Sequence, residues 1–257
     1  NSISRSQPLL DCCAFNPIKI WRHYGIVALS FYSAGSYAGA IEYQREAVRR
    51  ALVSDDPEMT CLSYVHLGLM LGKIGEYQEG LRNARLGYET AATRATDIRA
   101  KRLMAYASLQ LGHLEREMGD CENALRNYDE SIAIYEGQNF LTHSYQGHKG
   151  RLLCYIKQNN DSQVGRELQT TLSLINNNRS TIFEADDRNK FFDIEQSIYD
   201  LGIEYAFDRQ NDRQTAFAYS EDSRARSLLD LMQSGRSKGD SGQNANNVFD
   251  PLPLTEI

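Results

Sequence analysis

The sequence predicts an all-α protein, a right-handed superhelical array of about five helical hairpins. Three observations predict this fold. Apolar residues between Ile18 and Met232 recur at helical spacing throughout. A pattern of glycine and other small residues repeats at intervals of about 40 residues, which is typical of arrays of helical hairpins. Turn-forming residues separate the repeated segments from one another.

The repeat is anchored on three glycines. These are Gly35, Gly75 and Gly119, which lie 40 and 44 residues apart. Each glycine suits a turn between two helices, where a positive φ is often needed. Small residues recur seven residues before, five after and twelve after each anchor: Ala28, Gly68, Gly112; Ala40, Gly80, Ala124; Ala47, Gly87, Ser131. Small side chains at these positions allow two antiparallel helices to approach closely.

The first three hairpins follow from these anchors. We expect the first helix of each hairpin over 18–34, 60–74 and 100–118, and the second over 37–53, 77–95 and 121–136. Ser54 to Pro57 ends the first hairpin, and Glu136 to Asn139 ends the third. The acidic pair Asp55-Asp56 lies at such a junction, as does Asp186-Asp187, so turn and capping roles explain both pairs.

Two further hairpins have a weaker pattern. The fourth is expected over 143–158 and 161–176, with a break at Asn176 to Ser180. The fifth is expected over 187–209 and 213–232, with a turn at Gln210 to Asp212. Residues 233–247 are rich in Gly, Ser, Asn and Lys without apolar periodicity, which predicts a flexible linker.

These residues resemble the tetratricopeptide repeat, whose pattern has an aromatic residue, Leu-Gly and then Gly-x-Tyr-x-x-Ala. The periods of 40 and 44 exceed the usual 34, and the customary closing proline is missing. The resemblance implies a concave surface lined by the first helix of each hairpin, where extended peptides commonly lie.

A second resemblance concerns the carboxyl end. The helix Thr215 to Met232 contains Arg-Ala-Arg-Ser-Leu-Leu-Asp at 224–230, and Pro251 to Ile257 reads PLPLTEI. In bacterial proteins that join tetratricopeptide repeats to a CHAT domain, a caspase-like cysteine protease fold, the first segment resembles the helix that closes the repeats. The second resembles the opening of the CHAT domain. No position matches that domain's catalytic motifs. The resemblance implies an amino-terminal extension (1–17), a repeat domain (18–232), a linker (233–250) and the truncated start of a CHAT-like domain (251–257).

Composition and charge exclude several classes of function. There are 28 Lys and Arg against 34 Asp and Glu, so the net charge of −6 gives no general attraction to nucleic acid or anionic membrane. An apolar run of about 18 residues, as a membrane span requires, does not occur. Free thiols are typical of the reducing cytoplasm, where we expect this chain. The sequence begins without an initiator methionine or a signal-peptide pattern, so an original targeting signal could have been removed.

Catalytic, cofactor and metal motifs are missing. Neither GxxxxGK[ST], GxGxxG, GxSxG nor HExxH occurs. The cysteines lack metal spacing and are expected to be buried free thiols: Cys12, Cys13, Cys61, Cys121, Cys154. The histidines are expected to be ordinary helix residues: His23, His66, His113, His143, His148. We therefore predict no cofactor, no metal and no enzymatic activity of this segment.

The repeat register predicts which first-helix residues face the concave surface. The polar or aromatic ones are Arg22, Tyr32, Lys73, Tyr106, His113, Arg116, Gln146, Lys149 and Lys157. Five of these nine are Lys or Arg in an acidic chain, so an acidic peptide or a free carboxylate is the complementary ligand. A solvated helix face with scattered basic residues explains the same pattern.

Three functions remain open at this point. The first is a protein- or peptide-binding scaffold that serves as the recognition arm of a CHAT-type cysteine protease, with the missing carboxyl-terminal domain as a second partner. The second is a self-contained, peptide-responsive regulator of bacterial signalling. The third is a hydrolase that uses the chain's own His and Cys. The final PLPLTEI favours the first function over the second.

Overall fold

The computed structural model describes residues 20–181 and 196–224, and these residues form helices and turns without any strand. The predicted all-α class is therefore confirmed for the described residues. None of the helices among them is long and apolar enough to cross a membrane. The chain divides into two compact units, with the boundary between Asn139 and Phe140, and each unit is described by itself.

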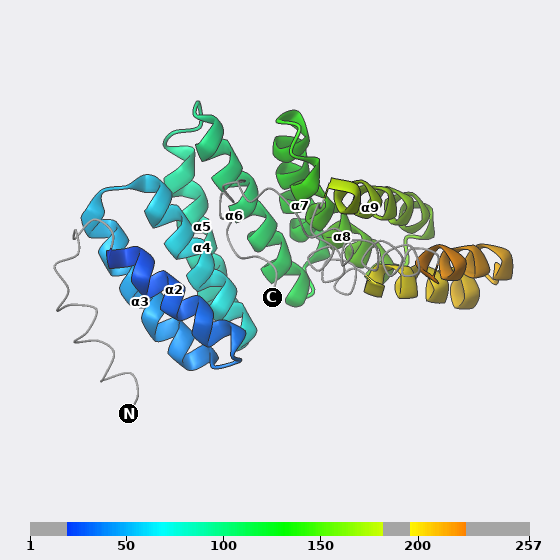
Figure 1. The fold of residues 1–257 in the computed structure, drawn as a ribbon, viewed down its shortest axis with the longest axis horizontal. Helices are drawn as coiled ribbons and strands as arrows, with labels where there is room; N and C mark the ends of the chain where they lie inside the picture. The colour runs from blue at the N-terminus through cyan, green and yellow to red at the C-terminus, as the bar shows by residue number, and fades with distance from the viewer. Residues whose placement is uncertain (1–19, 182–195, 225–257) are drawn as a thin grey trace, which may run out of the picture. The chain divides into compact units, whose positions relative to one another are not determined.

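Unit 1 contains three antiparallel hairpins in chain order, which can be followed in Figure 1. The first helices of the hairpins, called A helices below, are α2 (Ile20–Ser33), α4 (Pro57–Lys73) and α6 (Ile98–Glu117). The second helices, called B helices, are α3 (Tyr37–Ser54), α5 (Tyr77–Ala92) and α7 (Cys121–Gly137). All six helices match the predicted ranges to within about three residues, the usual uncertainty of helix boundaries.

The three anchor glycines make the turns within the hairpins. Their φ angles are +74° at Gly35, +83° at Gly75 and +88° at Gly119. The residue after each glycine donates its backbone N–H to a carbonyl five residues back: Ser36 to Phe31 (2.8 Å), Glu76 to Leu71 (3.0 Å) and Asp120 to Glu115 (2.9 Å). This is the glycine-dependent helix ending in which a left-handed residue satisfies the last carbonyls. The predicted need for a positive φ is confirmed.

The small residues of the repeat lie where two helices touch. A Cβ added at Gly68 in α4 would stand 2.7 Å from the carbonyl oxygen of Gly80 in α5. One added at Gly87 would stand 2.6 Å from Val65 Cγ2. The predicted close approach of antiparallel helices is therefore confirmed within the second hairpin.

Aspartates begin three of these helices. Asp56 accepts hydrogen bonds from the backbone N–H groups of Glu58 and Met59, and Asp97 and Asp120 cap α6 and α7. Asp55 adopts the left-handed conformation at the end of α3, with φ of 51°. The turn and capping roles predicted for Asp55-Asp56 are confirmed.

Polar contacts join one hairpin of unit 1 to the next. Gln44 Nε2 of α3 donates to the carbonyl oxygen of Ser63 in α4 at 2.9 Å. Glu130 of α7 accepts from Tyr88 Oη of α5 at 2.5 Å and from Ser108 Oγ of α6 at 2.8 Å. Burial raises the pKa of Tyr88 to about 12, and the bond to Glu130 adds to the rise. The bridging carboxylate therefore connects three helices.

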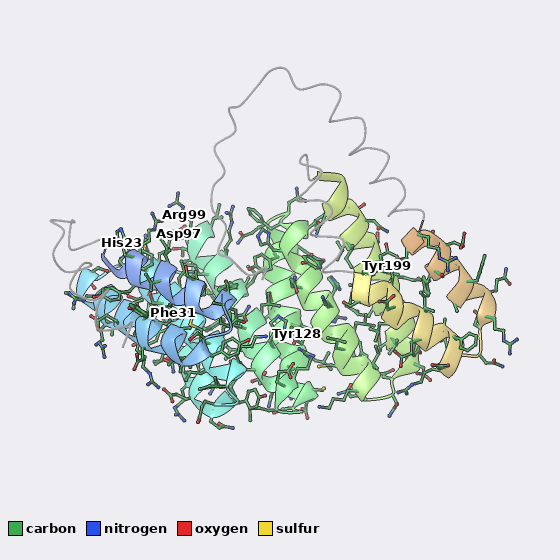
Figure 2. All side chains as sticks on the ribbon, turned by 60° about the horizontal axis from the view of Figure 1, so that its bottom comes forward. His23, Phe31, Asp97, Arg99, Tyr128 and Tyr199 are labelled. Carbon is green, nitrogen blue, oxygen red and sulfur yellow. The ribbon has the colours of Figure 1, made fainter. Side chains whose placement is uncertain are left out.

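Unit 2 contains the fourth and fifth hairpins. The fourth consists of α8 (Leu141–Lys157) and α9 (Asp161–Thr181). Residues 196–204 are α-helical and continue into one π-helical turn, η2 (Tyr205–Arg209), after which Asn211 turns the chain with φ of 52° and residues 213–224 are helical again. The core of this unit gathers Tyr145, Leu152, Leu168, Ile175 and Tyr199, the last of which is labelled in Figure 2.

The break predicted at Asn176 to Ser180 is wrong, because α9 continues through these residues to Thr181. Tertiary contacts explain the difference. The hydroxyl of Tyr199 donates to Asn176 Oδ1 at 2.8 Å, and Asn178 is only 5% exposed. Asparagine has a low intrinsic helix propensity, and packing against the fifth hairpin outweighs it here.

Several predicted features lie outside the described residues. They are the amino-terminal extension 1–17, the junction Asp186-Asp187, the end of the fifth hairpin at 225–232, the linker 233–250 and the segment 251–257.

The helix contact at Gly68 generates a stability prediction. Gly68→Ala should lower the free energy of unfolding by about 1–3 kcal/mol, because its Cβ would meet backbone atoms that cannot rotate away. Urea unfolding followed by circular dichroism measures this change. The matched control is Gly25→Ala in α2, where an added Cβ meets nothing within 4 Å; it should stabilise by about 0.5–1 kcal/mol. Equal stabilities of the two variants would contradict the packing argument.

Candidate partner-binding surface

The three A helices of unit 1 share one side of that unit. α4 contacts α6 and, over a few residues, α2, whereas α3 and α5 pack mainly on A helices. We call this side the inner surface. Six predicted groove residues belong to its helices: Arg22, Tyr32, Lys73, Tyr106, His113 and Arg116.

The A helices of unit 1 carry more basic than acidic residues. Six are basic: Arg22, Lys73, Arg99, Lys101, Arg102 and Arg116. Three are acidic: Glu58, Glu115 and Glu117. The B helices of the same unit have the opposite balance, with six basic residues (Arg45, Arg49, Arg50, Arg82, Arg85, Arg126) and eight acidic ones (Glu42, Glu46, Glu79, Glu89, Glu122, Asp129, Glu130, Glu136). Both sets of helices therefore carry the same number of basic residues, but only the A helices carry more basic than acidic residues.

Two of the three acidic residues on the A helices are already engaged. Glu115 is buried and accepts from Asn127 Nδ2 of α7 at 2.6 Å, and burial raises the pKa of its carboxyl. Glu117 is exposed and lies 2.7 Å from the guanidinium of Arg116. The third acidic residue, Glu58, lies in the first turn of α4.

Tyr32, Lys73 and Tyr106 come together on the inner surface from three different helices. Burial raises the pKa of Tyr32, while the charge of Lys73 and a hydrogen bond from it oppose that rise. The ionisation of Tyr106 is in turn electrostatically coupled to Tyr32. Lys73 is exposed, but Tyr106 is only 5% exposed and offers little surface to a ligand in the free protein.

His66 is a residue of this surface that the repeat register did not select. It lies seven residues before Lys73 on α4, and its ring meets the ring of Tyr106 edge-on, with centroids 6.0 Å apart. Among the described residues, neither His66 Nε2 nor Tyr106 Oη has a hydrogen-bond partner. Burial lowers the pKa of His66 to about 4. The helical spacing from Lys73 was the available signal in the sequence.

His113 and Arg116 meet at the hydroxyl of Tyr128, which is labelled in Figure 2. Arg116 Nε donates to Tyr128 Oη at 3.3 Å, and His113 Nδ1 lies 2.9 Å from the same oxygen. Tyr128 reaches this position because Gly112 has no side chain: a Cβ there would stand 2.7 Å from the Tyr128 ring. The end of α6 therefore holds its arginine in a defined place.

The remaining predicted groove residues lie on α2 and, in unit 2, on α8. Arg22 is exposed, with its guanidinium 5.9 Å from the ring centroid of Trp21. The last three lie on α8 in unit 2. Gln146 donates to the hydroxyl of Tyr145, Lys149 is half-buried and Lys157 is exposed in the last turn. The nine residues therefore fall into a set of six on unit 1 and a set of three on unit 2.

A buried charged cluster in unit 2 has a structural role. Glu167 of α9 lies 2.6 Å from His148 Nδ1 and 3.2 Å from the guanidinium of Arg151, both on α8. The His148 and Glu167 side chains are almost fully buried. Because removing one partner of such a cluster leaves an uncompensated charge, this contact couples α8 firmly to α9.

The described cysteines lie in the core of the protein. Cys61 and Cys121 are free and buried, as predicted, and Cys154 is buried, while Cys12 and Cys13 lie outside the described residues. Burial raises the pKa of the Cys61 thiol to about 12, which disfavours the thiolate that a nucleophile requires. Within the described part of the chain, no three His, Cys, Asp or Glu residues gather as metal ligands would.

Comparisons with known proteins place the fold. No protein-family model matches the sequence, and no curated protein matches it. The structure is similar to that of BtubC (BKLC) from P. vanneervenii, with 13% identity, a TM-score of 0.64 and coverage of 98% of this chain and 93% of that one. A kinesin light chain TPR-like repeat protein of Podosopora anserina is 15% identical, with a TM-score of 0.58 and coverage of 82% and 95%.

A third similar structure is a Rap protein complexed with Competence and Sporulation Factor, which is 14% identical, with a TM-score of 0.59 and coverage of 90% of this chain and 70% of that one. At these identities the likenesses establish the fold alone. The described residues therefore form an array of tetratricopeptide-like helical hairpins.

The burial of His66 generates a pH prediction. Its ordinary pKa is 6.5 and its folded value about 4, so the unfolded chain binds a proton below pH 6.5 that the folded chain does not bind. The contribution of His66 to stability is therefore complete above pH 6.5 and falls by about 3 kcal/mol as the pH drops to 4. Urea unfolding at several pH values measures this loss, and His66→Leu should make the same profile shallower. If the free energy of unfolding falls equally steeply with decreasing pH in both proteins, His66 is not the cause of the loss.

Proposed function

We propose that this chain is a protein-binding scaffold whose inner surface takes an acidic peptide segment of a partner protein. The observation that carries the proposal is the excess of basic over acidic residues on the A helices of unit 1, in a chain whose net charge is −6. A positive surface on a negatively charged molecule favours acidic partners.

The basic side chains of this surface differ in how firmly they are held. Arg116 has one nitrogen on Tyr128 Oη and another on Glu117, and its side chain is 25% exposed. Lys73 is exposed beside Tyr32. A carboxylate of the partner would replace Glu117 as the companion of Arg116. Fixed side chains lose less conformational entropy on binding, so Arg116 is the better anchor of the two.

Reversing two of these charges tests the proposal. Single exposed contacts are worth about 0.2–1 kcal/mol, so the double variant Lys73→Glu with Arg116→Glu should weaken binding of an acidic peptide about tenfold or more. The measurement is fluorescence anisotropy with a labelled library of acidic peptides at low and moderate salt. Added salt should narrow the difference in affinity between the unchanged protein and the double variant, because it screens the charges.

The matched control changes the same total charge on the B helices. Arg82→Glu with Arg126→Glu alters exposed residues of the B helices α5 and α7, and should leave binding within about twofold of the unchanged protein. Equal loss in both double variants would mean that only overall charge matters. Unchanged affinity after Lys73→Glu with Arg116→Glu would remove the inner surface as the recognition site.

For the biological setting we propose the recognition arm of a CHAT-type cysteine protease in a bacterial cytoplasm. The residues that support it are Arg224 to Asp230 and Pro251 to Ile257, which resemble the junction between repeats and protease in such proteins. The missing domain would then be a second partner of this chain. The reading frame beyond Ile257 tests this: a following domain with a His and Cys pair supports it, and any other continuation excludes it.

The alternative is a self-contained, peptide-responsive regulator. One observation favours it, namely the structural similarity to a Rap protein complexed with a peptide factor over 90% of this chain. A regulator of this kind changes shape when its peptide binds. Small-angle scattering with and without a bound acidic peptide separates the two, since a passive arm keeps its radius of gyration.

A further inference from the structure

Two buried side chains whose rings meet across neighbouring A helices of unit 1 each hold a polar atom without a hydrogen-bond partner among the described residues. These atoms are His66 Nε2 on α4 and Tyr106 Oη on α6. We propose that His66 and Tyr106 form a polar subsite that selects a carboxamide side chain, Asn or Gln, in the bound segment. This inference rests on the proposed peptide-binding function of the same surface.

The surroundings of the pair make these unpartnered atoms costly. Tyr106 packs with Cys61, Val65, Ala91 and Ala107, and the partly buried Leu62 and Leu103 lie against the same cluster. Apolar neighbours cannot supply the missing hydrogen bonds, and a buried polar group left unpaired reduces stability. A phenylalanine would fill the position of Tyr106 without that loss. A hydroxyl at such a position is explained if a ligand pairs with it.

The protonation states of the pair determine which ligand group fits. Burial raises the pKa of Tyr106, so its hydroxyl stays protonated and can donate. His66 is neutral at pH 7 because burial lowers its pKa to about 4, and the other ionisable groups coupled to Tyr106 are Tyr135, Cys61 and Tyr32. A carboxylate offers only acceptors, so it could not pair with an unprotonated Nε2 of His66. An apolar side chain would leave both atoms unpaired. A carboxamide supplies a carbonyl acceptor and an N–H donor together.

The distance to Lys73 adds a sequence rule for the ligand. Lys73 follows His66 by seven residues on α4, which corresponds to about 10 Å along the helix axis. An extended peptide covers about 10 Å in three residues. A segment lying along α4 would therefore place an acidic residue three positions away from its carboxamide residue. Because both subsite atoms are closed in the free protein, entry of the ligand requires a side-chain rotation at the pair.

The probe is an acetylated and amidated hexapeptide of alanine with glutamine second and glutamate fifth. Its binding is measured by isothermal titration and by NMR shifts of the protein. Tyr106→Phe should weaken its binding about tenfold while raising the melting temperature, because the variant loses an unpaired hydroxyl. A second hexapeptide with leucine in place of glutamine should bind both proteins equally. Moving the glutamate next to the glutamine should weaken binding to the unchanged protein.

The control variant is Ser131→Ala. Ser131 Oγ on α7 is also buried and without a partner among the described residues, but it belongs to a B helix. This variant should gain stability and leave peptide binding unchanged. The subsite is wrong if Tyr106→Phe binds the glutamine peptide as tightly as the unchanged protein does, or if the leucine peptide binds equally well to the unchanged protein. The two proposals can fail separately. If Lys73→Glu with Arg116→Glu abolishes binding of acidic peptides but the unchanged protein shows no preference for glutamine, the proposed function stands and only the subsite is rejected.

Discussion

The structure of unit 1 depends on how closely paired helices approach at positions that have no side chain. At Gly68 and Gly80 the two backbones of the second hairpin nearly touch, since a Cβ at either position would meet the other's carbonyl oxygen within 3 Å. Gly112 has the same role for a side chain, because it admits the ring of Tyr128. That ring in turn positions Arg116 and His113 at the end of α6. The close packing inside the hairpins therefore also determines where these residues of the candidate surface lie.

Hydrophobic contacts hold adjacent hairpins together, and buried polar contacts specify their register. The carboxylate of Glu130 joins three helices through Tyr88 and Ser108, and in unit 2 Glu167 joins α8 to α9. Such contacts contribute modestly to net stability, but a shift of one helix relative to another would leave them unpaired. Each hairpin of a repeat array contacts mainly its neighbours, so specificity of this kind must be built at every interface.

The inner surface combines exposed charge with buried polar groups. Lys73 is available to solvent, Arg116 is partly held by its neighbours, and the His66 and Tyr106 pair is enclosed. Exposed charges set the rate and the salt dependence of an encounter, whereas enclosed hydrogen-bonding groups discriminate strongly between ligands that do and do not pair with them. The proposed binding of acidic segments depends on the exposed charges, and the proposed carboxamide subsite depends on the enclosed groups.

The sequence alone determined the helical hairpins, because the positive φ of the anchor glycines and the small residues at helix contacts are local requirements that leave a periodic signature. It also located the basic A helices, since charge on one helix of each hairpin can be read from composition. Tertiary structure decided the rest. The helix through Asn176 persists because Tyr199, 23 residues away, bonds to it. Tyr106 is buried and His66 joins it because the distance between α4 and α6 is set by packing, which residue spacing within one helix does not contain.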